Sequence, residues 1–306
     1  MEVKTANVAW CVGIETAYRR MHQHASGAAE MPSYATHHAQ QAGTQTDMDT
    51  LLRIAQGDAQ LLARYPALQH VQVVSDLATV PSDATLLVGF QGLARDTIEH
   101  LTGRGVTVKN YKCPFIAKLD ATVERLVAEG FDILILGKRQ NHHCQYAQEI
   151  ASTHQRQCRV LETLDDVDTI PGDTGAQWAL VGQVTGNTLL WQAVVERLYH
   201  RGLPVHVRQT ICSDSYQRQQ NALDLAQQVD RCVIVDDGGA ASQSLFEVLS
   251  GVHPQVTRVR WREDGSWQAA VDVSWLTGAR SVAVLGGILV PQWALDAVAA
   301  YIESVA

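Results

Sequence analysis

Short apolar runs, each bounded by Gly, Asp or Pro, recur along the chain. The runs are TLLVGF (85–90), DILILG (132–137), WALVG (178–182), CVIVDD (232–237) and SVAVLGG (281–287). Uninterrupted apolar runs of this length are typical of strands that are buried on both faces of a parallel sheet. Because helix-like stretches separate them, the pattern predicts an α/β fold with mainly parallel sheets.

The stretches between these runs repeat their apolar residues with a helical period. In FIAKLDATVERLVAEG (115–130), one stripe contains Ile116, Leu119, Val123, Leu126 and Val127. This spacing predicts a helix with one buried face that stops at Gly130. A similar pattern in SYQRQQNALDLAQQ (215–228) predicts another helix.

The segment 24–66 differs from the rest of the chain, because its first half is polar and weakly patterned. We expect this half to be a loop or a cover over another part of the protein. From Asp47 onward the pattern predicts a helix that ends before Pro66.

Composition narrows the class of protein. Of the 306 residues, 46% are hydrophobic, which is enough for a large core. The net charge is −8 and the Lys and Arg residues are scattered, which argues against nucleic-acid binding. No apolar run reaches the length of a membrane span, and the N-terminal stretch MEVKTANVAW lacks an apolar signal segment. We expect a cytoplasmic protein that does not bind membranes.

The six cysteines suggest a redox or metal site. They are Cys11, Cys113, Cys144, Cys158, Cys212 and Cys232. A disulfide framework does not suit a long chain without a secretion signal, and no CxxC pair supports a structural zinc site. The alternative for each cysteine taken singly is a small buried core residue.

Three of these cysteines share a local setting. Pro114 favours the first position of a helix, which makes Cys113 the N-cap residue after the strand-like VTVKNY (106–111). Cys11 follows the strand-like NVAW (7–10), and Cys212 precedes the helix-like 215–228. The free N–H groups and the dipole of a helix start stabilise a thiolate.

The spacing of these three cysteines predicts a repeated architecture. They lie about a hundred residues apart, which suggests three similar α/β units over 12–112, 113–205 and 206–306, the last completed by 1–11. Three thiolates that meet at one point suit an iron–sulfur cluster, because soft ligands select it. A [4Fe–4S] cluster normally takes four thiolates, so three leave one iron open.

The stretches around the three cysteines resemble motifs of one family. WCVGIETA (10–17) is similar to an FCAGV-like stretch, NYKCPFIAKLD (110–120) to DATCPLVTKVH, and ICSDSYQRQ (211–219) to ICYATTNRQ. In order and spacing they resemble the LytB family, the 4-hydroxy-3-methylbut-2-enyl diphosphate reductases. The resemblance covers most of the chain and is weakest over 24–66.

This resemblance implies a fold, a cofactor and a reaction. The fold is a trefoil of three similar α/β units around a central [4Fe–4S] cluster, with Cys11, Cys113 and Cys212 as its metal ligands. The reaction is the reductive removal of an allylic hydroxyl from a small molecule at the open iron. It requires an electron donor such as ferredoxin or flavodoxin.

Residues expected to deliver protons depart from the family pattern. The family's GHxGHPE corresponds to GKRQNHHCQ (137–145), which lacks the proton-delivering glutamate. The nearest residues are His142 and His143, and histidine has a suitable pKa for proton delivery. The alternatives are a solvated loop for the two histidines and, for Cys144, capping of the fourth iron.

Two substrate-binding stretches of the family are also altered. FQG stands in place of AHG, which puts Gln91 where a diphosphate-binding histidine is expected. GQVTGN corresponds to the family's TQTT stretch; it keeps Gln183, places Val184 at the usual threonine, and is followed by Thr185. We expect Gln91, Gln183 and Thr185 to contact the substrate, and ordinary turn chemistry is the alternative for the last two.

The remaining anion-binding stretches follow the same trend. AASQS stands in place of the family's SSN, so Ser242 is retained and Gln243 replaces asparagine. Leu289 stands where the family has a serine. A diphosphate requires several convergent donors, so these changes predict a substrate without a diphosphate, with Ser242 and Gln243 at a helix start that suits a different anion such as a carboxylate.

Three classes of function are therefore compatible with the sequence. The first is a cluster-dependent reductase for a hydroxylated small molecule. The second is a sulfur-transfer or desulfurising enzyme, in which the open iron carries an additional sulfide. The third is a non-catalytic iron–sulfur sensor or binding protein.

Overall fold

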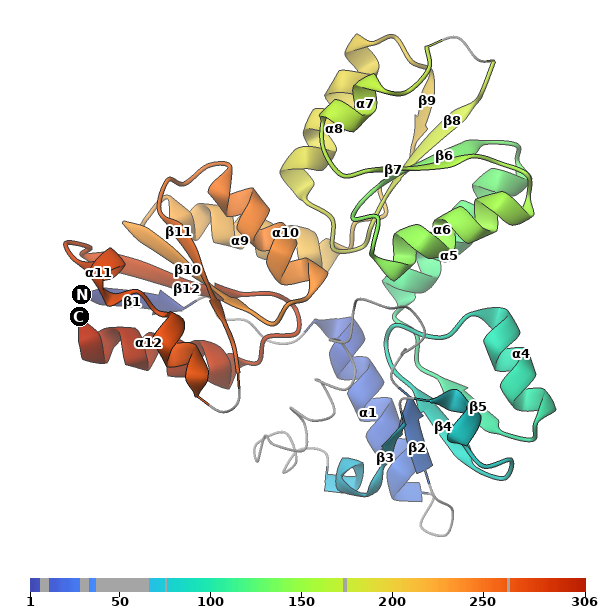
Figure 1. The fold of residues 1–306 in the computed structure, drawn as a ribbon, viewed down its shortest axis with the longest axis horizontal. Coiled ribbons are helices and arrows are strands. Elements are labelled where there is room, and N and C mark those ends of the chain that lie inside the picture. Colours follow the sequence, from blue (N-terminus) through green and yellow to red (C-terminus); the bar gives the residue numbers. More distant parts are fainter. Residues whose placement is uncertain (6–10, 28–32, 37–65, 75, 173–174, 263–264) are drawn as a thin grey trace. The chain divides into compact units, whose positions relative to one another are not determined.

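The computed structural model describes residues 1–5, 11–27, 33–36, 66–74, 76–172, 175–262 and 265–306 (Figure 1). Within these residues the strands form three four-stranded sheets, and every strand pair is parallel. This confirms the predicted α/β class with parallel sheets and three similar units.

We name each sheet after one of its inner strands. The β4 sheet contains β2 (Ser33–Thr36), β3 (Gln72–Val74), β4 (Thr85–Val88) and β5 (Thr107–Asn110). The β6 sheet contains β6 (Asp132–Leu136), β7 (Cys158–Leu161), β8 (Trp178–Gly182) and β9 (Val205–Val207). The β10 sheet contains β1 (Glu2–Thr5), β10 (Arg231–Asp236), β11 (Val256–Arg260) and β12 (Ser281–Gly286).

The three sheets share one strand order. The order is β3-β2-β4-β5 in the β4 sheet and β7-β6-β8-β9 in the β6 sheet. In each of these sheets the strand that comes last along the chain, β5 or β9, lies at one edge. The third sheet has the order β11-β10-β12-β1 when read in the same direction. Its fourth position is filled from the N-terminus, because β1 pairs with β12 with Glu2 opposite Ser281.

Helices connect and cover these strands. The α-helices are α1 (Val12–Gly27), α4 (Arg95–Gly103), α5 (Pro114–Ala128), α6 (His142–Thr153), α7 (Asp165–Asp168), α8 (Thr188–His200), α9 (Ser213–Ala226), α10 (Ala240–Ser250), α11 (Val273–Leu276) and α12 (Gln292–Val305). Short 3-10 helices are η1 (Pro66–His70), η2 (Leu77–Thr79) and η3 (Ser266–Ala270). The predicted apolar stripe of 115–130 lies on α5, and all five of its members are buried.

The apolar runs in the sequence form the centres of the sheets. Every residue of β4, β6 and β8 is buried. In the β10 sheet, one face packs against α12 in a core that includes Val233 and Val298. The other face packs against α9 and α10 through Ile234, Ala222 and Leu245. Burial on both faces explains why these strands show no polar alternation.

The structure corrects one expectation for the segment 24–66. Residues Ser33–Thr36, predicted to lie in a loop, form the inner strand β2, which pairs with β3 on one side and β4 on the other. A four-residue strand is too short to show a period, so its position depends on partners far along the chain. The expected strand at 7–10 and the expected helix before Pro66 lie outside the described residues.

The chain divides into two compact units. One contains Met1–Trp10 with Lys118–Ala306, and the other contains Cys11–Ala117. The β4 sheet belongs to the second unit, and the β6 and β10 sheets belong to the first. Among the helices that the structure describes, none has both the length and the apolar character required to cross a membrane.

Candidate iron–sulfur and substrate site

Three cysteines occupy equivalent positions relative to the three sheets. Cys11, Cys113 and Cys212 immediately precede α1, α5 and α9, and each carbonyl accepts the first helical hydrogen bond, from Glu15 N (3.0 Å), Ala117 N (2.9 Å) and Tyr216 N (2.9 Å) respectively. These helices come after β1, β5 and β9, the strands that fill the same edge position of each sheet. The predicted N-cap position of Cys113 before Pro114 is therefore confirmed.

Two of these thiols converge within the unit Cys11–Ala117. A Cβ atom placed on Gly13 would lie 2.7 Å from Cys113 Sγ and 3.8 Å from Cys11 Sγ. Both sulfur atoms therefore border the space that a side chain at position 13 would fill, and both residues are only 8% exposed. The absence of a side chain at Gly13 allows the first turn of α1 to approach the start of α5.

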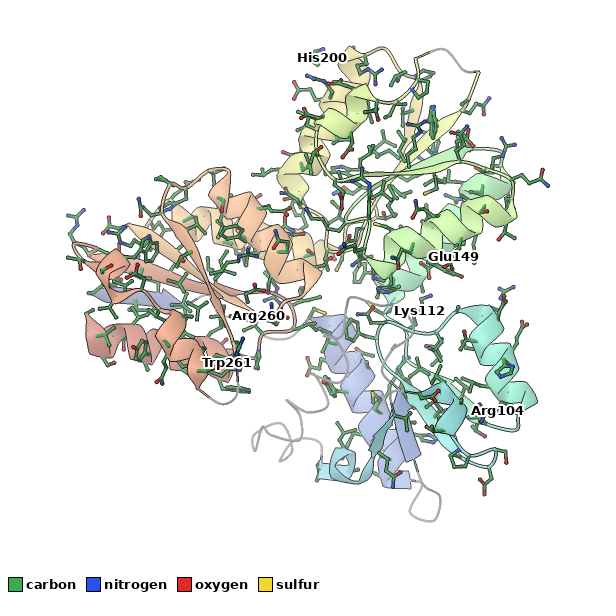
Figure 2. All side chains as sticks on the ribbon, viewed as in Figure 1. Arg104, Lys112, Glu149, His200, Arg260 and Trp261 are labelled. Atoms are coloured by element: carbon green, nitrogen blue, oxygen red, sulfur yellow. The ribbon has the colours of Figure 1, made fainter. Side chains whose placement is uncertain are left out.

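Gln91 is held near Cys113 by a backbone hydrogen bond of the preceding residue, Phe90. The Cys113 N–H donates to the carbonyl oxygen of Phe90 at 2.7 Å, which fixes the turn that contains Gln91 against the start of α5. Lys112, which Figure 2 labels, packs its alkyl chain against Gly92 on the other side of Gln91. The structure thus brings the predicted substrate residue Gln91 close to Cys113.

Cys212 belongs to the other unit, where it is fixed to the loop after β8. Its N–H donates to the carbonyl oxygen of Val184 at 2.9 Å. Gln219 of α9 strengthens this connection, because its Oε1 accepts hydrogen bonds from the N–H and the hydroxyl of Thr188. Gln219 is buried and was not singled out from the sequence, where a glutamine on a polar helix gives no signal of burial.

Gln183 and Thr185 lie on the same loop and bind each other. Gln183 Nε2 donates to Thr185 Oγ1 at 2.7 Å, while Gln183 Oε1 accepts from the backbone N–H of Lys138 at 3.1 Å. Gln183 is 1% exposed. Its amide therefore connects the loops after β6 and β8, and its predicted contact with a substrate remains a prediction.

The two predicted proton donors begin α6 at the same edge of the β6 sheet. Asn141 caps this helix, with its Oδ1 accepting from His143 N at 3.0 Å. The rings of His142 and His143 have centroids 3.7 Å apart, and His143 is buried. Since both histidines follow β6 and Gln183 follows β8, the parallel pairing of these strands brings them to one edge. Their role in proton delivery remains a prediction.

The other three cysteines lie in different surroundings. Burial raises the pKa of the Cys144 thiol to about 12, of Cys158 to about 12 and of Cys232 to about 11. Cys144 Sγ lies 3.8 Å from Gln183 Oε1, as a thiol donor to that amide oxygen. The capping of an iron by Cys144 remains an alternative.

Ser242 and Gln243 lie in the first turn of α10, after β10. Ser242 is fully buried and its hydroxyl donates to Asp237 Oδ1 at 2.8 Å. Gln243 donates to Glu247 Oε1 at 2.8 Å and its own amide oxygen accepts from Arg258. Both predicted substrate residues thus have partners within the protein. Asp237 was missed, although the Asp-Gly-Gly turn before this helix was visible in the sequence.

The ligand chemistry of the thiol positions fits an iron–sulfur cluster. Cysteine thiolates are the ligands that such clusters take, and a helix start supplies N–H groups toward the sulfur. Among the residues that the structure describes, no three His, Cys, Asp or Glu side chains gather as they would around a single metal ion. The fold and these positions define an α/β protein of three parallel sheets with a cysteine at each equivalent helix start.

Comparison with known proteins identifies the family. Residues 3–303 match the family model described as LytB protein, so the chain belongs to the LytB family. The 4-hydroxy-3-methylbut-2-enyl diphosphate reductase of Trichlorobacter lovleyi is 30% identical over 230 residues, covering 74% of this chain and 78% of that protein. The enzyme of the same name from Clostridioides difficile is 22% identical over 247 residues, covering 80% and 84%.

Solved structures share the fold. The E-1-hydroxy-2-methyl-but-2-enyl-4-diphosphate reductase of Plasmodium falciparum aligns with a TM-score of 0.75 at 14% identity, covering 97% of this chain and 86% of that one. A structure of (E)-4-hydroxy-3-methyl-but-2-enyl diphosphate reductase aligns with a TM-score of 0.56 at 18% identity, covering 99% of both chains. The LytB fold is thereby established for this protein.

Proposed function

We propose that this protein is a [4Fe–4S]-dependent reductase of the LytB type that removes a hydroxyl group from a small molecule. The observation that carries the proposal is the equivalence of Cys11, Cys113 and Cys212 at three helix starts. The convergence of two of these thiols at Gly13 supports it further. Membership of a family whose named relatives are reductases gives independent support.

The three cysteines would hold the cluster, which supplies the electrons and a Lewis-acidic iron when it is bound. The overall change is R–OH + 2e⁻ + 2H⁺ → R–H + H₂O, in which the C–O bond breaks and the substrate carbon is reduced. The electrons come one at a time from a carrier such as ferredoxin or flavodoxin. We place the protein in the cytoplasm, where thiols stay reduced.

The chain's own residues would position the substrate and supply protons. An imidazolium of His142 or His143 gives its proton to the leaving hydroxyl oxygen, which departs as water. Gln91 offers an amide next to Cys113 to orient the substrate. The loop that contains Gln183 and Thr185 is hydrogen-bonded to Cys212 at the start of α9, and it would also orient the substrate.

We further propose that the substrate lacks the diphosphate that the names of the related reductases specify. Leu289, at the position where the resemblance predicts a serine, is 7% exposed and has no donor to offer. Val184 is similarly buried. Because an unpaired buried charge costs several kcal/mol, about 1–3 for each donor that is missing, a diphosphate would bind weakly among such residues. The amide of Gln91 suits an uncharged or singly charged substrate, whereas the Ser242 hydroxyl already donates to Asp237.

The experiment is analysis of anaerobically purified protein for iron and acid-labile sulfide, with electron paramagnetic resonance after dithionite reduction. The spectrum is recorded alone and with the diphosphate substrate of the reductases. We expect four irons and four sulfides per chain and a signal that the diphosphate does not change. A shifted signal or turnover would refute the substrate proposal. Sulfide in excess of iron would favour sulfur transfer, and protein without iron would refute the reductase.

A further inference from the structure

The start of α10 has the features of an anion site. Figure 1 shows α10 following β10, and Figure 2 marks Arg260 and Trp261 at the carboxyl end of the neighbouring β11. The backbone N–H of Trp261 donates to the carbonyl oxygen of Asp236 at 3.0 Å, which extends the pairing of β10 and β11 by one residue beyond Arg260. A helix of this length directs free N–H groups and a positive dipole end toward whatever lies before it.

The protein's own carboxyl group already occupies this position. Asp237 Oδ1 accepts hydrogen bonds from Gly239 N at 2.9 Å and from the Ser242 hydroxyl at 2.8 Å. The two donors are the backbone N–H of the N-cap residue Gly239 and the hydroxyl of Ser242 in the first turn of α10. An external anion at the start of α10 would need the same donors. The second oxygen, Oδ2, is buried and has no hydrogen-bond partner among the residues that the structure describes, although part of the residue reaches solvent.

The backbone of Gly287 lies against Ser242 on the side away from Asp237 and leaves no room for a ligand there. A Cβ atom placed on Gly287 would lie 2.4 Å from Ser242 Oγ and 2.8 Å from Ser242 N. The loop after β12 therefore lies directly against the hydroxyl and the amide of Ser242. A phosphate group, which is far larger than a methyl group, has no room on that side.

Two cations near this position are paired with other carboxyl groups. Asp236 Oδ2 lies 3.7 Å from Arg258 Nη1, and Lys138 Nζ lies 2.7 Å from Glu247 Oε1. Neither cation is directed to Asp237 by these contacts. Burial, and to a lesser degree the charge of Asp236, raises the pKa of the Asp237 carboxyl. The carboxyl is thus held where its charge is poorly compensated.

We propose that Asp237 acts as an internal anion that fills the start of α10 and excludes phosphate and diphosphate groups from this edge of the β10 sheet. It is a specificity-determining residue: it takes the available donors and repels a second negative group at close range. The inference rests on the proposed function and deepens it, because it gives a physical cause for a substrate without a diphosphate.

The test is calorimetric titration of the cluster-loaded protein with inorganic pyrophosphate at fixed ionic strength. We expect no measurable binding by the native protein. Asp237→Ala frees the two donors, so we expect pyrophosphate to bind about tenfold to a hundredfold more tightly than to the native chain. Asp237→Asn keeps an acceptor for the donors and removes only the charge, and we expect a smaller gain.

Two controls assign the effect to this site. Asp236→Asn removes one negative charge from the neighbouring position, and we expect it to leave pyrophosphate binding unchanged. Adding Ser242→Ala to Asp237→Ala should abolish the gain, which would exclude binding elsewhere. Circular dichroism establishes that each variant is folded.

The proposal is overturned if the native protein binds pyrophosphate as tightly as Asp237→Ala. It is also overturned if neither Asp237 variant gains affinity beyond that of Asp236→Asn. The second result would leave the proposed function intact, with another cause for the missing diphosphate. Turnover of the diphosphate substrate by the native protein would refute the proposed substrate class whichever way the Asp237 variants behave.

Discussion

The start of α5 and the start of α10 are built alike but present opposite chemistry. Each follows a strand of a parallel sheet, at the edge where the carboxyl ends of the strands lie. At α5 the residue before the helix is Cys113, whose sulfur would lie only 2.7 Å from a Cβ atom on Gly13. At α10 the corresponding space contains the Asp237 carboxyl and the backbone of Gly287. The shared geometry supplies donors, and one or two side chains decide what uses them.

The six cysteines illustrate the same lesson. Those at the three helix starts precede a first turn whose backbone N–H groups have no partner within the helix. Cys144, Cys158 and Cys232 lie where burial raises the thiol pKa to between about 11 and about 12. A thiol in the latter setting serves as a small packing residue.

The largest expected effect comes from removing one thiol at α5. Cys113→Ser replaces a soft ligand with a hard one, so we expect nearly all iron and sulfide to be lost. Iron analysis and the visible absorbance of anaerobic protein measure this. The matched control is Cys232→Ser, a buried cysteine of β10, which should keep the full iron content. Equal iron in the two variants would remove Cys113 from the ligand set.

The next effect comes from filling the space beside the two thiols. In Gly13→Ala the new methyl would lie 2.7 Å from Cys113 Sγ, so we expect displacement of the thiol, a lower iron content, and destabilisation by about 1–3 kcal/mol. Iron analysis and urea unfolding measure the two effects. Gly27→Ala, at the other end of α1, meets no atom of the described residues within 4 Å. A loss of iron in both variants would show that space at position 13 is not the cause.

A third variant disturbs the closed start of α10 without touching the thiols. In Gly287→Ala the methyl would meet Ser242 Oγ at 2.4 Å and Ser242 N at 2.8 Å. Because backbone atoms cannot easily give way, we expect destabilisation by about 2–3 kcal/mol with the iron content unchanged. Urea unfolding tests this against Gly172→Ala, where no atom of the part of the chain that the structure describes lies within 4 Å. Equal stability of the two variants would argue against the close approach at Ser242.

The smallest effect is a dependence of stability on pH. Burial raises the pKa of Asp237 in the folded state, so folding favours its protonated form. The free energy of unfolding of the native protein, relative to Asp237→Asn, should be highest below the ordinary aspartate pKa. It should then fall as the pH rises through the folded pKa. Urea midpoints at a series of pH values measure the difference.

Asp230 provides a control of opposite sign. Hydrogen bonds from the backbone of Arg280 and Ser281 lower the pKa of its carboxyl. The stabilisation that the Asp230 carboxyl gives to the folded state should be fully present above the ordinary aspartate pKa. It should be lost as the pH falls through the lowered pKa of Asp230 in the folded protein. Asp230→Asn should therefore lose stability relative to the native protein at neutral pH. The same pH trend for both variants would contradict the Asp237 environment described here.

The sequence by itself determined the features that depend on near neighbours. Apolar runs without alternation identified the inner strands other than β2, the helical period of 115–130 identified the buried face of α5, and Pro114 placed Cys113 at a helix start. Each follows from backbone conformation or burial within one element, which a few adjacent residues decide. The family resemblance rested on the same local motifs.

Only the tertiary structure decided which distant segments meet. It paired β1 with β12, inserted β2 between β3 and β4, and brought the thiols of Cys11 and Cys113 to Gly13. It also placed the loop after β12 against Ser242 and engaged the side chain of Gln243 with Arg258 of β11. These outcomes depend on strand pairing and on hydrogen bonds between loops, and their energies involve residues whose separation along the chain carries no local signal.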